Sequence, residues 1–335
     1  MRQATPPLRT RLARTALALA VATVPLSAGA AGQQEDTLSI GYQKGSGLLT
    51  VLKAQKTLEK RLAPEGITVR WHEFAAGPQL LEALNAGSID VGQTGAPPAV
   101  FAQAAGADLV YVGAEPNAEE TEAVITPADS DLHDVAALKG RKVALQKGSS
   151  AHYLLVKTLE RAGLSLSDIQ PVWLPPADAR AAFATGSVDA WAIWDPYLAA
   201  IESQDDVRRL ADYHGLEPTN SFYEASRPFA EQHPQTLALL RDTVAETGAW
   251  ANTHKSDMAQ LLSGQLGLPE AVVSRWLERN HYGISPMSDD VVRRQQQVAD
   301  TFRAQGLIPR DVDVASAVWQ APEQQTSTAA SAAQP

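Results

Sequence analysis

The sequence predicts an α/β protein made of two similar lobes, because two of its segments occur twice. The first repeated segment is a Gln-Lys-Gly-Ser loop at residues 43–46 and 146–149, each time between an apolar run and a helical pattern. The second is a Gly-Ser-aliphatic-Asp segment at residues 87–90 and 186–189. The copies of the two segments lie 103 and 99 residues apart, so one unit of strands and helices is used twice.

The first unit begins with the apolar run that enters the first loop. Alternating and apolar runs predict strands, whereas apolar residues on one stripe, closed by glycine, predict helices. A polar segment at residues 115–120 is typical of a crossing between lobes. In chain order, we expect a strand at 38–42, a helix at 48–62, a strand at 68–74, a helix at 77–87, a strand from 89 to 91 leading into a loop at 92–98, a helix at 100–104 and a strand at 109–113.

The second unit repeats this order, and a second polar crossing is expected at residues 213–220. We expect strands at 124–126, 143–146, 172–174, 188–193 and 207–210, and helices at 134–138, 150–163 and 176–186. Helices are then expected at 228–233, 234–252, 256–266, 269–279 and 288–305, covering the first lobe. These elements assign residues 36–117 and 214–320 to lobe I, 118–213 to lobe II, and 321–335 to a disordered polar tail.

Composition excludes several classes of protein. With 335 residues and 44% hydrophobic positions, the chain can bury the cores of about two domains. It has no cysteine, which excludes disulfides, thiolate zinc sites and thiol catalysis. A net charge of −10 argues against a nucleic-acid partner, which needs a basic surface.

The first 30 residues have the pattern of a secretory signal peptide. Four arginines precede an apolar run at residues 15–26, and Ala28-Gly29-Ala30 is an Ala-x-Ala cleavage site. The run is shorter than the ~20 residues that a membrane anchor needs. We expect cleavage after Ala30, and without a nearby cysteine for lipid attachment the mature protein is expected to be free, with a net charge of −14.

The second repeated loop has the features of an anion site. Gly148 allows a sharp turn, Ser149 or Ser150 can cap the following helix, and the first helical amides have no internal partner. These amides and the helix dipole suit a negative charge. The alternative is an ordinary capped helix start.

Motifs for catalysis or cofactor binding are missing. The seven histidines lack metal-ligand spacing, and the sequence contains no Gly-x-Ser-x-Gly elbow, Walker loop or Gly-x-Gly-x-x-Gly signature. The sequence therefore predicts a binding site without a catalyst, and no metal or cofactor.

Several segments together resemble the periplasmic solute-binding proteins of ABC importers. Within that class they are similar to the aliphatic-sulfonate-binding family, which is related to the taurine- and nitrate-binding families. The segments are Gly-Tyr-Gln-Lys-Gly at 41–45, Gly-Pro-Gln-Leu-Leu-Glu-Ala-Leu at 77–84, Phe-Ala-Gln-Ala-Ala-Gly-Ala-Asp-Leu-Val-Tyr at 101–111, Gln-Lys-Gly-Ser-Ser at 146–150, Pro-Ala-Asp-Ala-Arg-Ala-Ala-Phe at 176–183 and Ala-Trp-Ala-Ile-Trp-Asp-Pro-Tyr at 190–197.

This resemblance implies two Rossmann-like lobes, of the type II-like periplasmic binding protein fold, that close over an organic sulfonate in the cleft between them. It implies a monomer that delivers the sulfonate to the membrane permease of an ABC importer. The family's ligand contacts correspond to Gln43, Thr94, Gly95, Ser149, Ser150, His152, Trp194, Asp195 and Tyr223.

The chain departs from the family at residues 94–98. Thr-Gly-Ala-Pro-Pro lacks the acid that usually follows the glycine and suits an amine-bearing ligand, which argues against taurine. Taurine, nitrate, a carboxylate and a thiamin precursor stay open as ligands. The rival class is a secreted enzyme on the same fold, including the pyrimidine-synthase-like proteins, although such relatives use a cysteine. Asp195 could cap a helix, act at a hinge or meet a cationic part of a ligand.

The same site predicts the conditions under which binding occurs. A sulfonate stays a monoanion with three acceptor oxygens, so amides and hydroxyls can satisfy it without a buried counter-charge. We expect affinity to depend weakly on salt, and to be nearly constant from about pH 6 to 8 unless His152 contributes.

Overall fold

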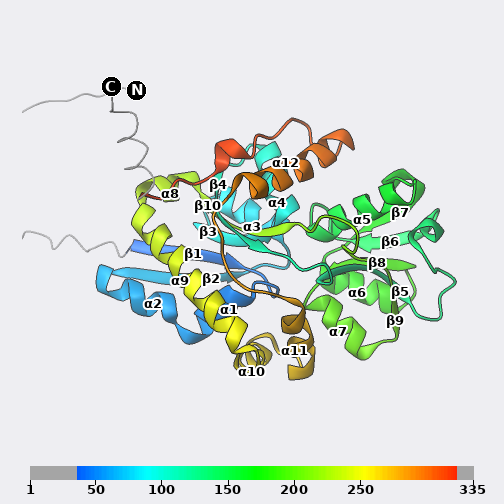
Figure 1. The fold of residues 1–335 in the computed structure, drawn as a ribbon, viewed down its shortest axis with the longest axis horizontal. Helices are drawn as coiled ribbons and strands as arrows, with labels where there is room; N and C mark the ends of the chain where they lie inside the picture. The colour runs from blue at the N-terminus through cyan, green and yellow to red at the C-terminus, as the bar shows by residue number, and fades with distance from the viewer. Residues whose placement is uncertain (1–35, 323–335) are drawn as a thin grey trace, which may run out of the picture. The chain divides into compact units, whose positions relative to one another are not determined.

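Two five-stranded sheets with the same strand pattern organise residues 36–322, the part of the chain that the computed structural model describes. The first sheet has the order β2-β1-β3-β10-β4 and the second β7-β6-β8-β5-β9 (Figure 1). In each sheet three neighbouring strands are parallel, and the fourth in the order is antiparallel to both of its neighbours. The predicted two-lobed α/β fold is confirmed. The predicted signal peptide and nearly all of the predicted tail lie outside the described residues.

The strands of the first sheet are β1 (Asp36–Tyr42), β2 (Ile67–Glu73), β3 (Val91–Gly95), β4 (Leu109–Pro116) and β10 (Asn220–Ser226). Those of the second sheet are β5 (Glu122–Pro127), β6 (Lys142–Leu145), β7 (Gln170–Trp173), β8 (Ala190–Trp194) and β9 (Val207–Ala211). The helices are α1 (Gly47–Gln55), α2 (Thr57–Leu62), α3 (Gly77–Asn85), α4 (Ala96–Ala105), α5 (Ser150–Arg161), α6 (Pro176–Ala184), α7 (Tyr197–Gln204), α8 (Arg227–Gln232), α9 (Pro234–Thr253), α10 (Lys255–Leu266), α11 (Glu270–Arg279) and α12 (Asp289–Ala304).

The repeated aspartate has the same structural role in both lobes. Before β3, the Asp90 carboxylate accepts a hydrogen bond from the backbone amide of Ser39 in β1, at 2.7 Å. Before β8, the Asp189 carboxylate accepts from the amide of Lys142 in β6, also at 2.7 Å. Each aspartate thus joins the entry of one parallel strand to its neighbour, which explains why the segment occurs twice.

Several elements differ from the sequence prediction. The helix expected at 48–62 is two helices, because Lys56 adopts a left-handed conformation between α1 and α2. Much of the loop expected at 92–98 is strand β3, whose pairing with β1 and β10 overrides the weak strand propensity of its glycines. Strand β10 and helix α7 were not predicted; β10 is rich in polar residues yet occupies an interior position in its sheet.

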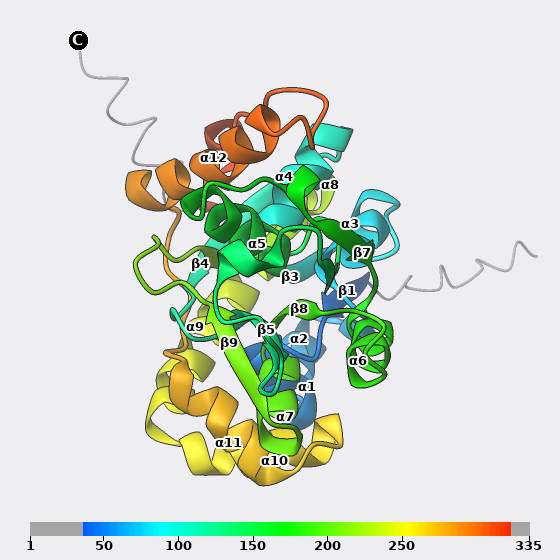
Figure 2. The same cartoon turned by 90° about the vertical axis from the view of Figure 1, so that its right-hand side faces the viewer.

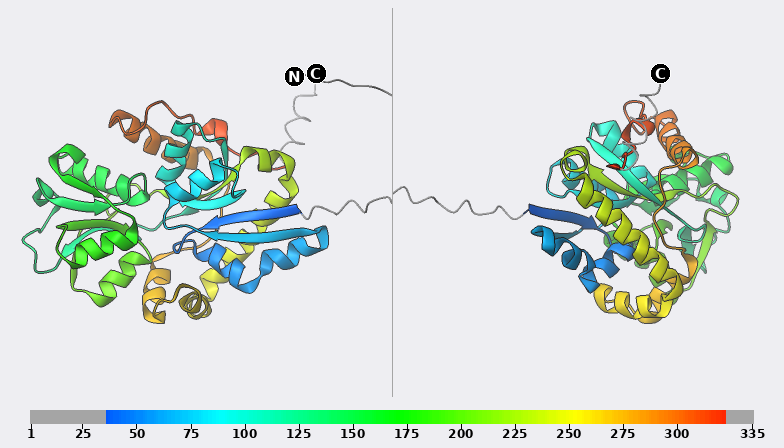
Figure 3. Two further views of the ribbon diagram at one scale, coloured as in Figure 1. Left: turned by 180° about the vertical axis from the view of Figure 1, so that it is seen from behind. Right: turned by 60° about the vertical axis from the view of Figure 1, so that its left-hand side comes forward.

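The connections between the sheets follow β4 and β9, at residues 117–121 and 212–219. After β10, helix α9 packs on α1 and α2, and α12 packs on α4, so both cover the first sheet as expected. Helix α11 was also expected to cover the first lobe, but it packs in addition against α7, which follows β8 of the second sheet (Figure 2). The reverse view shows the two sheets with their helical layers (Figure 3). No helix within residues 36–322 is long and apolar enough to span a bilayer.

Candidate functional site

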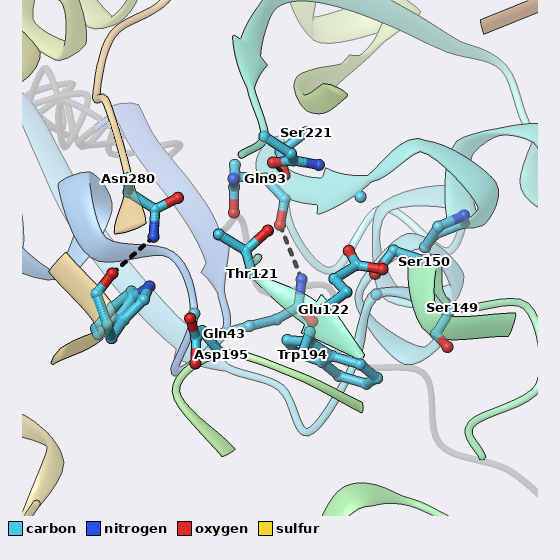
Figure 4. Close-up of a pocket in the computed structure, with 16 residues that line it drawn as sticks. Gln43, Gln93, Thr121, Glu122, Ser149, Ser150, Trp194, Asp195, Ser221 and Asn280 are labelled. Carbon is cyan, nitrogen blue, oxygen red and sulfur yellow. Dashed lines mark hydrogen bonds between the residues drawn. The ribbon is translucent and has the colours of Figure 1, made fainter. Parts of the chain in front are cut away.

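A cavity of about 90 Å³ lies where elements of both sheets meet (Figure 4). Its wall includes the ends of β1, β3 and β8, the first connection between the sheets, the start of α5 and the end of α11. Among the described residues, no lysine, arginine or histidine lines it. Its polar groups come from the amide side chains of Gln43, Gln93, Asn117 and Asn280, the hydroxyls of Thr121, Ser149, Ser150 and Ser221, and the carboxyls of Glu122 and Asp195.

The first Gln-Lys-Gly-Ser loop is tied to strand β3. The side-chain amide of Gln43 donates to the backbone carbonyl of Gln93 at 3.0 Å. The Ser46 hydroxyl donates to Oε1 of Gln93 at 2.6 Å and accepts from the amide of Gln43 at 3.1 Å. These bonds hold both glutamine side chains in place at the cavity wall.

The second loop presents the start of a helix. Gly148 has a φ of 75°, which favours glycine, and Ser149 caps α5 by accepting from the amide of His152 at 3.3 Å. The first backbone hydrogen bonds of α5 are donated by His152 and Tyr153 to the carbonyl of Ser149. The amides of Ser150 and Ala151 precede those bonds, at the positive end of the helix dipole. The sharp turn, the serine cap and the first helical amides are arranged as the sequence predicted, an arrangement that fits both an anion site and an ordinary capped helix start.

Two glycines allow elements of the first sheet to approach elements of the second sheet closely at the cavity. A Cβ atom on Gly95, at the end of β3, would lie 3.1 Å from the Cβ of Ser150. A Cβ atom on Gly45 would lie 3.0 Å from the backbone carbonyl oxygen of Asp195. Side chains at either position would crowd the contact between the ends of these elements.

Asp195 is engaged within the protein. Its Oδ1 accepts from the amide of Ala199 at 2.9 Å, so it caps the first turn of α7, one of the three roles considered for it from the sequence. Both carboxylate oxygens lie 3.1 Å from Nη1 of Arg279, the last residue of α11, and Arg279 also pairs with Glu202 of α7. Burial raises the pKa of Asp195 to about 6, and the Arg279 guanidinium opposes that rise. Asp195 therefore links α11 to the end of β8.

Glu122 is the other carboxyl in the cavity, and its side chain lies beside Ser150 (Figure 4). The residue is only 5% exposed, and its Oε2 has no hydrogen-bond partner among residues 36–322. Burial raises the pKa of Glu122 to about 7. The sequence prediction did not include Glu122, because it opens a strand expected to begin only at residue 124.

Six of the nine predicted contacts line the cavity: Gln43, Gly95, Ser149, Ser150, Trp194 and Asp195. The other three side chains point elsewhere. The hydroxyl of Thr94 donates to Glu224 at 2.6 Å, and that of Tyr223 donates to Glu115 at 2.9 Å. His152 is fully buried, and burial lowers its pKa to about 4.

Other lining residues had no signal in the sequence. Asn117 and Thr121 lie in the polar crossing segment, which marks a connection but no ligand site. Trp276 and Asn280 come from α11 and its end, far along the chain from every repeated motif. Within residues 36–322, no three His, Asp or Glu side chains are grouped as metal ligands. The cavity is thus lined by amide, hydroxyl and carboxyl side chains and by the indole rings of Trp194 and Trp276.

Comparisons with known proteins identify the family of the chain. Residues 62–256 match the family described as NMT1/THI5 like. A protein of Escherichia coli (strain K12), named for binding aliphatic sulfonates, is 48% identical over 306 residues, which are 91% of this chain and 95% of that protein.

Two solved structures are similar over the same region. The alkanesulfonate-binding protein SsuA from Xanthomonas axonopodis pv. citri, bound to MOPS, is 45% identical with a TM-score of 0.82, over 85% of this chain and 98% of that one. The periplasmic aliphatic sulphonate binding protein SsuA from Escherichia coli is 47% identical with a TM-score of 0.78, over 85% of this chain and 92% of that one.

Proposed function

Because the chain belongs to the family of aliphatic-sulfonate-binding proteins, within the NMT1/THI5-like group, we propose that it binds aliphatic sulfonates in the periplasm for an ABC importer. The observation that carries this proposal is a cavity with amide and hydroxyl groups at a helix start and no basic side chain among the described residues. A sulfonate monoanion is satisfied by such neutral donors, whereas a dianion would need more charge compensation.

We propose that the sulfonate oxygens accept from the start of α5, at Ser150 and the following amide, and from the side chain of Gln43. The apolar chain of the ligand lies against the indoles of Trp194 and Trp276, both of which line the cavity. Ser149 and Asp195 support the site through the cap of α5 and the ion pair with Arg279. Gly95 leaves room for the ligand next to Ser150.

The organisation around this site is part of the proposal. Residues 36–117 with 214–320 form lobe I and 118–213 form lobe II, and the lobes close over the ligand. A signal peptide ending at Ala30 directs export, and the mature monomer delivers its ligand to the membrane permease. The chain acts as a binding protein and leaves its ligand chemically unchanged.

A thermal-shift panel followed by calorimetry tests the function. The ligands are methane-, ethane- and butanesulfonate, taurine, sulfate and nitrate, with propionate as a carboxylate matched in size to ethanesulfonate. The buffer must contain no sulfonate, because MOPS occupies the Xanthomonas relative. We expect stabilisation by alkanesulfonates above all. Stabilisation by nitrate or propionate alone, or conversion of a sulfonate to a product on incubation, would contradict the proposal.

A further inference from the structure

Glu122 occupies an unusual place for an acidic residue in a site for an anion. It opens β5 opposite Trp194 of β8, and its carboxyl group lies beside Ser150 at the start of α5 (Figure 4). The residue is 5% exposed, and Oε2 has no partner within residues 36–322. An ionised carboxylate here would lack both water and a full set of donors, which is costly in a buried position.

Within residues 36–322, the groups around Glu122 provide no counter-ion for its carboxylate. From the end of β8, Asp195 adds a second negative charge, and its cation Arg279 is already shared with Glu202. From the segment after β9, Tyr213 faces Glu122, and burial raises its pKa well above the usual value, so it stays neutral. Helix α5 contributes the Ser150 hydroxyl. An ionised Glu122 would therefore repel a bound sulfonate.

We propose that Glu122 is protonated in the sulfonate complex and acts as a neutral hydrogen-bond donor in the cavity, so that sulfonate binding at neutral and alkaline pH takes up a proton. This inference rests on the proposed function and adds the protonation state that the site requires. It also replaces the expectation of constant affinity between pH 6 and 8: His152 is neutral throughout that range, whereas Glu122 titrates within it.

The direction of the effect follows from linkage. Burial places the pKa of Glu122 near 7 in the free protein, and a sulfonate beside it favours the neutral form further. Below this pKa the acid already carries its proton, and affinity is constant. Above it the proton must be taken up on binding, so affinity falls by up to about tenfold per pH unit. If Glu122 is instead ionised and pairs with a cationic ligand group, such as the ammonium of taurine, then taurine binds more tightly than ethanesulfonate above this pKa.

Calorimetry with ethanesulfonate at several values from pH 6.5 to 8 tests the proposal. Two sulfonate-free buffers with different ionisation enthalpies, Tris and phosphate, report the protons exchanged, after a check that phosphate does not compete. For the wild type we expect affinity on the order of tenfold weaker at pH 8 than at pH 6.5, with uptake approaching one proton per ligand at pH 8. Glu122→Gln keeps a neutral donor, so its affinity should be constant with no uptake.

Glu120→Gln is the matched control, because Glu120 is exposed two residues earlier on the same segment. It should keep the wild-type pH profile. Constant wild-type affinity without proton exchange would overturn the inference while leaving the proposed function intact, and this measurement decides even if Glu122→Gln does not fold. Tighter binding of taurine than of ethanesulfonate at pH 8, lost in Glu122→Gln, would overturn it in favour of a charged Glu122. Absence of sulfonate binding at every pH would overturn the proposed function as well.

Discussion

At the scale of single residues, the two serines at the start of α5 have different partners. The Ser149 hydroxyl donates to the carbonyl of Gln146 at 2.8 Å and accepts from the amide of His152, so both of its roles lie within the protein. The Ser150 side chain lies beside Glu122 at the cavity. The proposed function therefore predicts separable effects for the two residues.

We expect Ser150→Ala to weaken sulfonate binding by about 1.5–3 kcal/mol, the value of a hydrogen bond to a charged group, with little change in the free energy of unfolding. Ser149→Ala should lower the free energy of unfolding by about 0.5–2 kcal/mol through the lost cap, with a smaller effect on affinity. Calorimetry and urea denaturation of both variants measure these quantities. Unchanged affinity in Ser150→Ala would show that the loop is only a capped helix start.

Residues of the site could be predicted where the signal was local. A Gly-Ser-Ser sequence before a helical pattern is a helix start in any context, so Ser149 and Ser150 were identified. His152 was included because the resemblance to the family implied it, but it lies about 200° around the helix axis from Ser150, and its ring is buried instead. Glu122 and Asn280 reach the cavity only through tertiary packing, which leaves no mark on the neighbouring sequence.

At the scale of elements, α11 joins the helical layer of the first sheet to the second sheet. The side chain of Arg279, at its end, is 8% exposed and pairs with the buried Asp195 and the half-buried Glu202. Arg275, one turn earlier, is 48% exposed and lies 3.6 Å from Glu202. Helix α11 thus contributes two arginines to Glu202, one with a buried side chain and one with an exposed side chain.

Arg279→Gln should lower the free energy of unfolding by about 3–5 kcal/mol, because it leaves the buried carboxylate of Asp195 without its cation, whereas Glu202 keeps its ion pair with Arg209. It should also weaken sulfonate binding, since Trp276 and Asn280 on this helix line the cavity. Arg275→Gln is the control and should change stability by less than about 1 kcal/mol. Thermal unfolding and calorimetry measure both variants; equal effects would show that the buried pair has no special role.

The C-terminal helices were predicted well because amphipathic patterns and proline or glycine boundaries are local features. Strand β10 was not predicted, because its Asn, Ser and Glu residues lack an apolar run. Glu224 sits within it, fully buried, and accepts from Thr94 of the neighbouring β3. Such a residue is compatible with an interior strand only through partners that are distant in sequence.

At the scale of the whole molecule, buried acids link stability to pH. Burial raises the pKa of Glu115 and of Glu122 to about 7, and that of Glu224 well above its usual value. The folded state therefore keeps protons that the unfolded chain has already lost. Stability falls as pH rises through the range between the unfolded and folded pKa values.

We expect the free energy of unfolding to decrease from pH 6.5 to 8, by up to about 1.4 kcal/mol per pH unit for each acid still protonated in the folded state. His152 does not oppose this trend, because its lowered pKa affects stability only below about pH 6.5. Urea denaturation at several pH values measures the slope. Glu224→Gln should reduce it, and stability that rises with pH would contradict the burial of these acids.

The net charge of the protein and the burial of its cavity together determine how sulfonate affinity responds to salt. The chain is net acidic, at −10, so long-range forces oppose an anion and its binding relies on short contacts in the cavity. Salt screens exposed charges beyond about 10 Å at 0.1 M and affects buried contacts little. The affinity for ethanesulfonate should therefore change by less than about threefold between 0.02 and 0.3 M sodium chloride.

The repeated-loop lysines, Lys44 and Lys147, do not line the cavity, so Lys44→Gln and Lys147→Gln should bind like the wild type. A steep loss of affinity with salt, removed by either substitution, would instead identify that lysine as the partner of the anion.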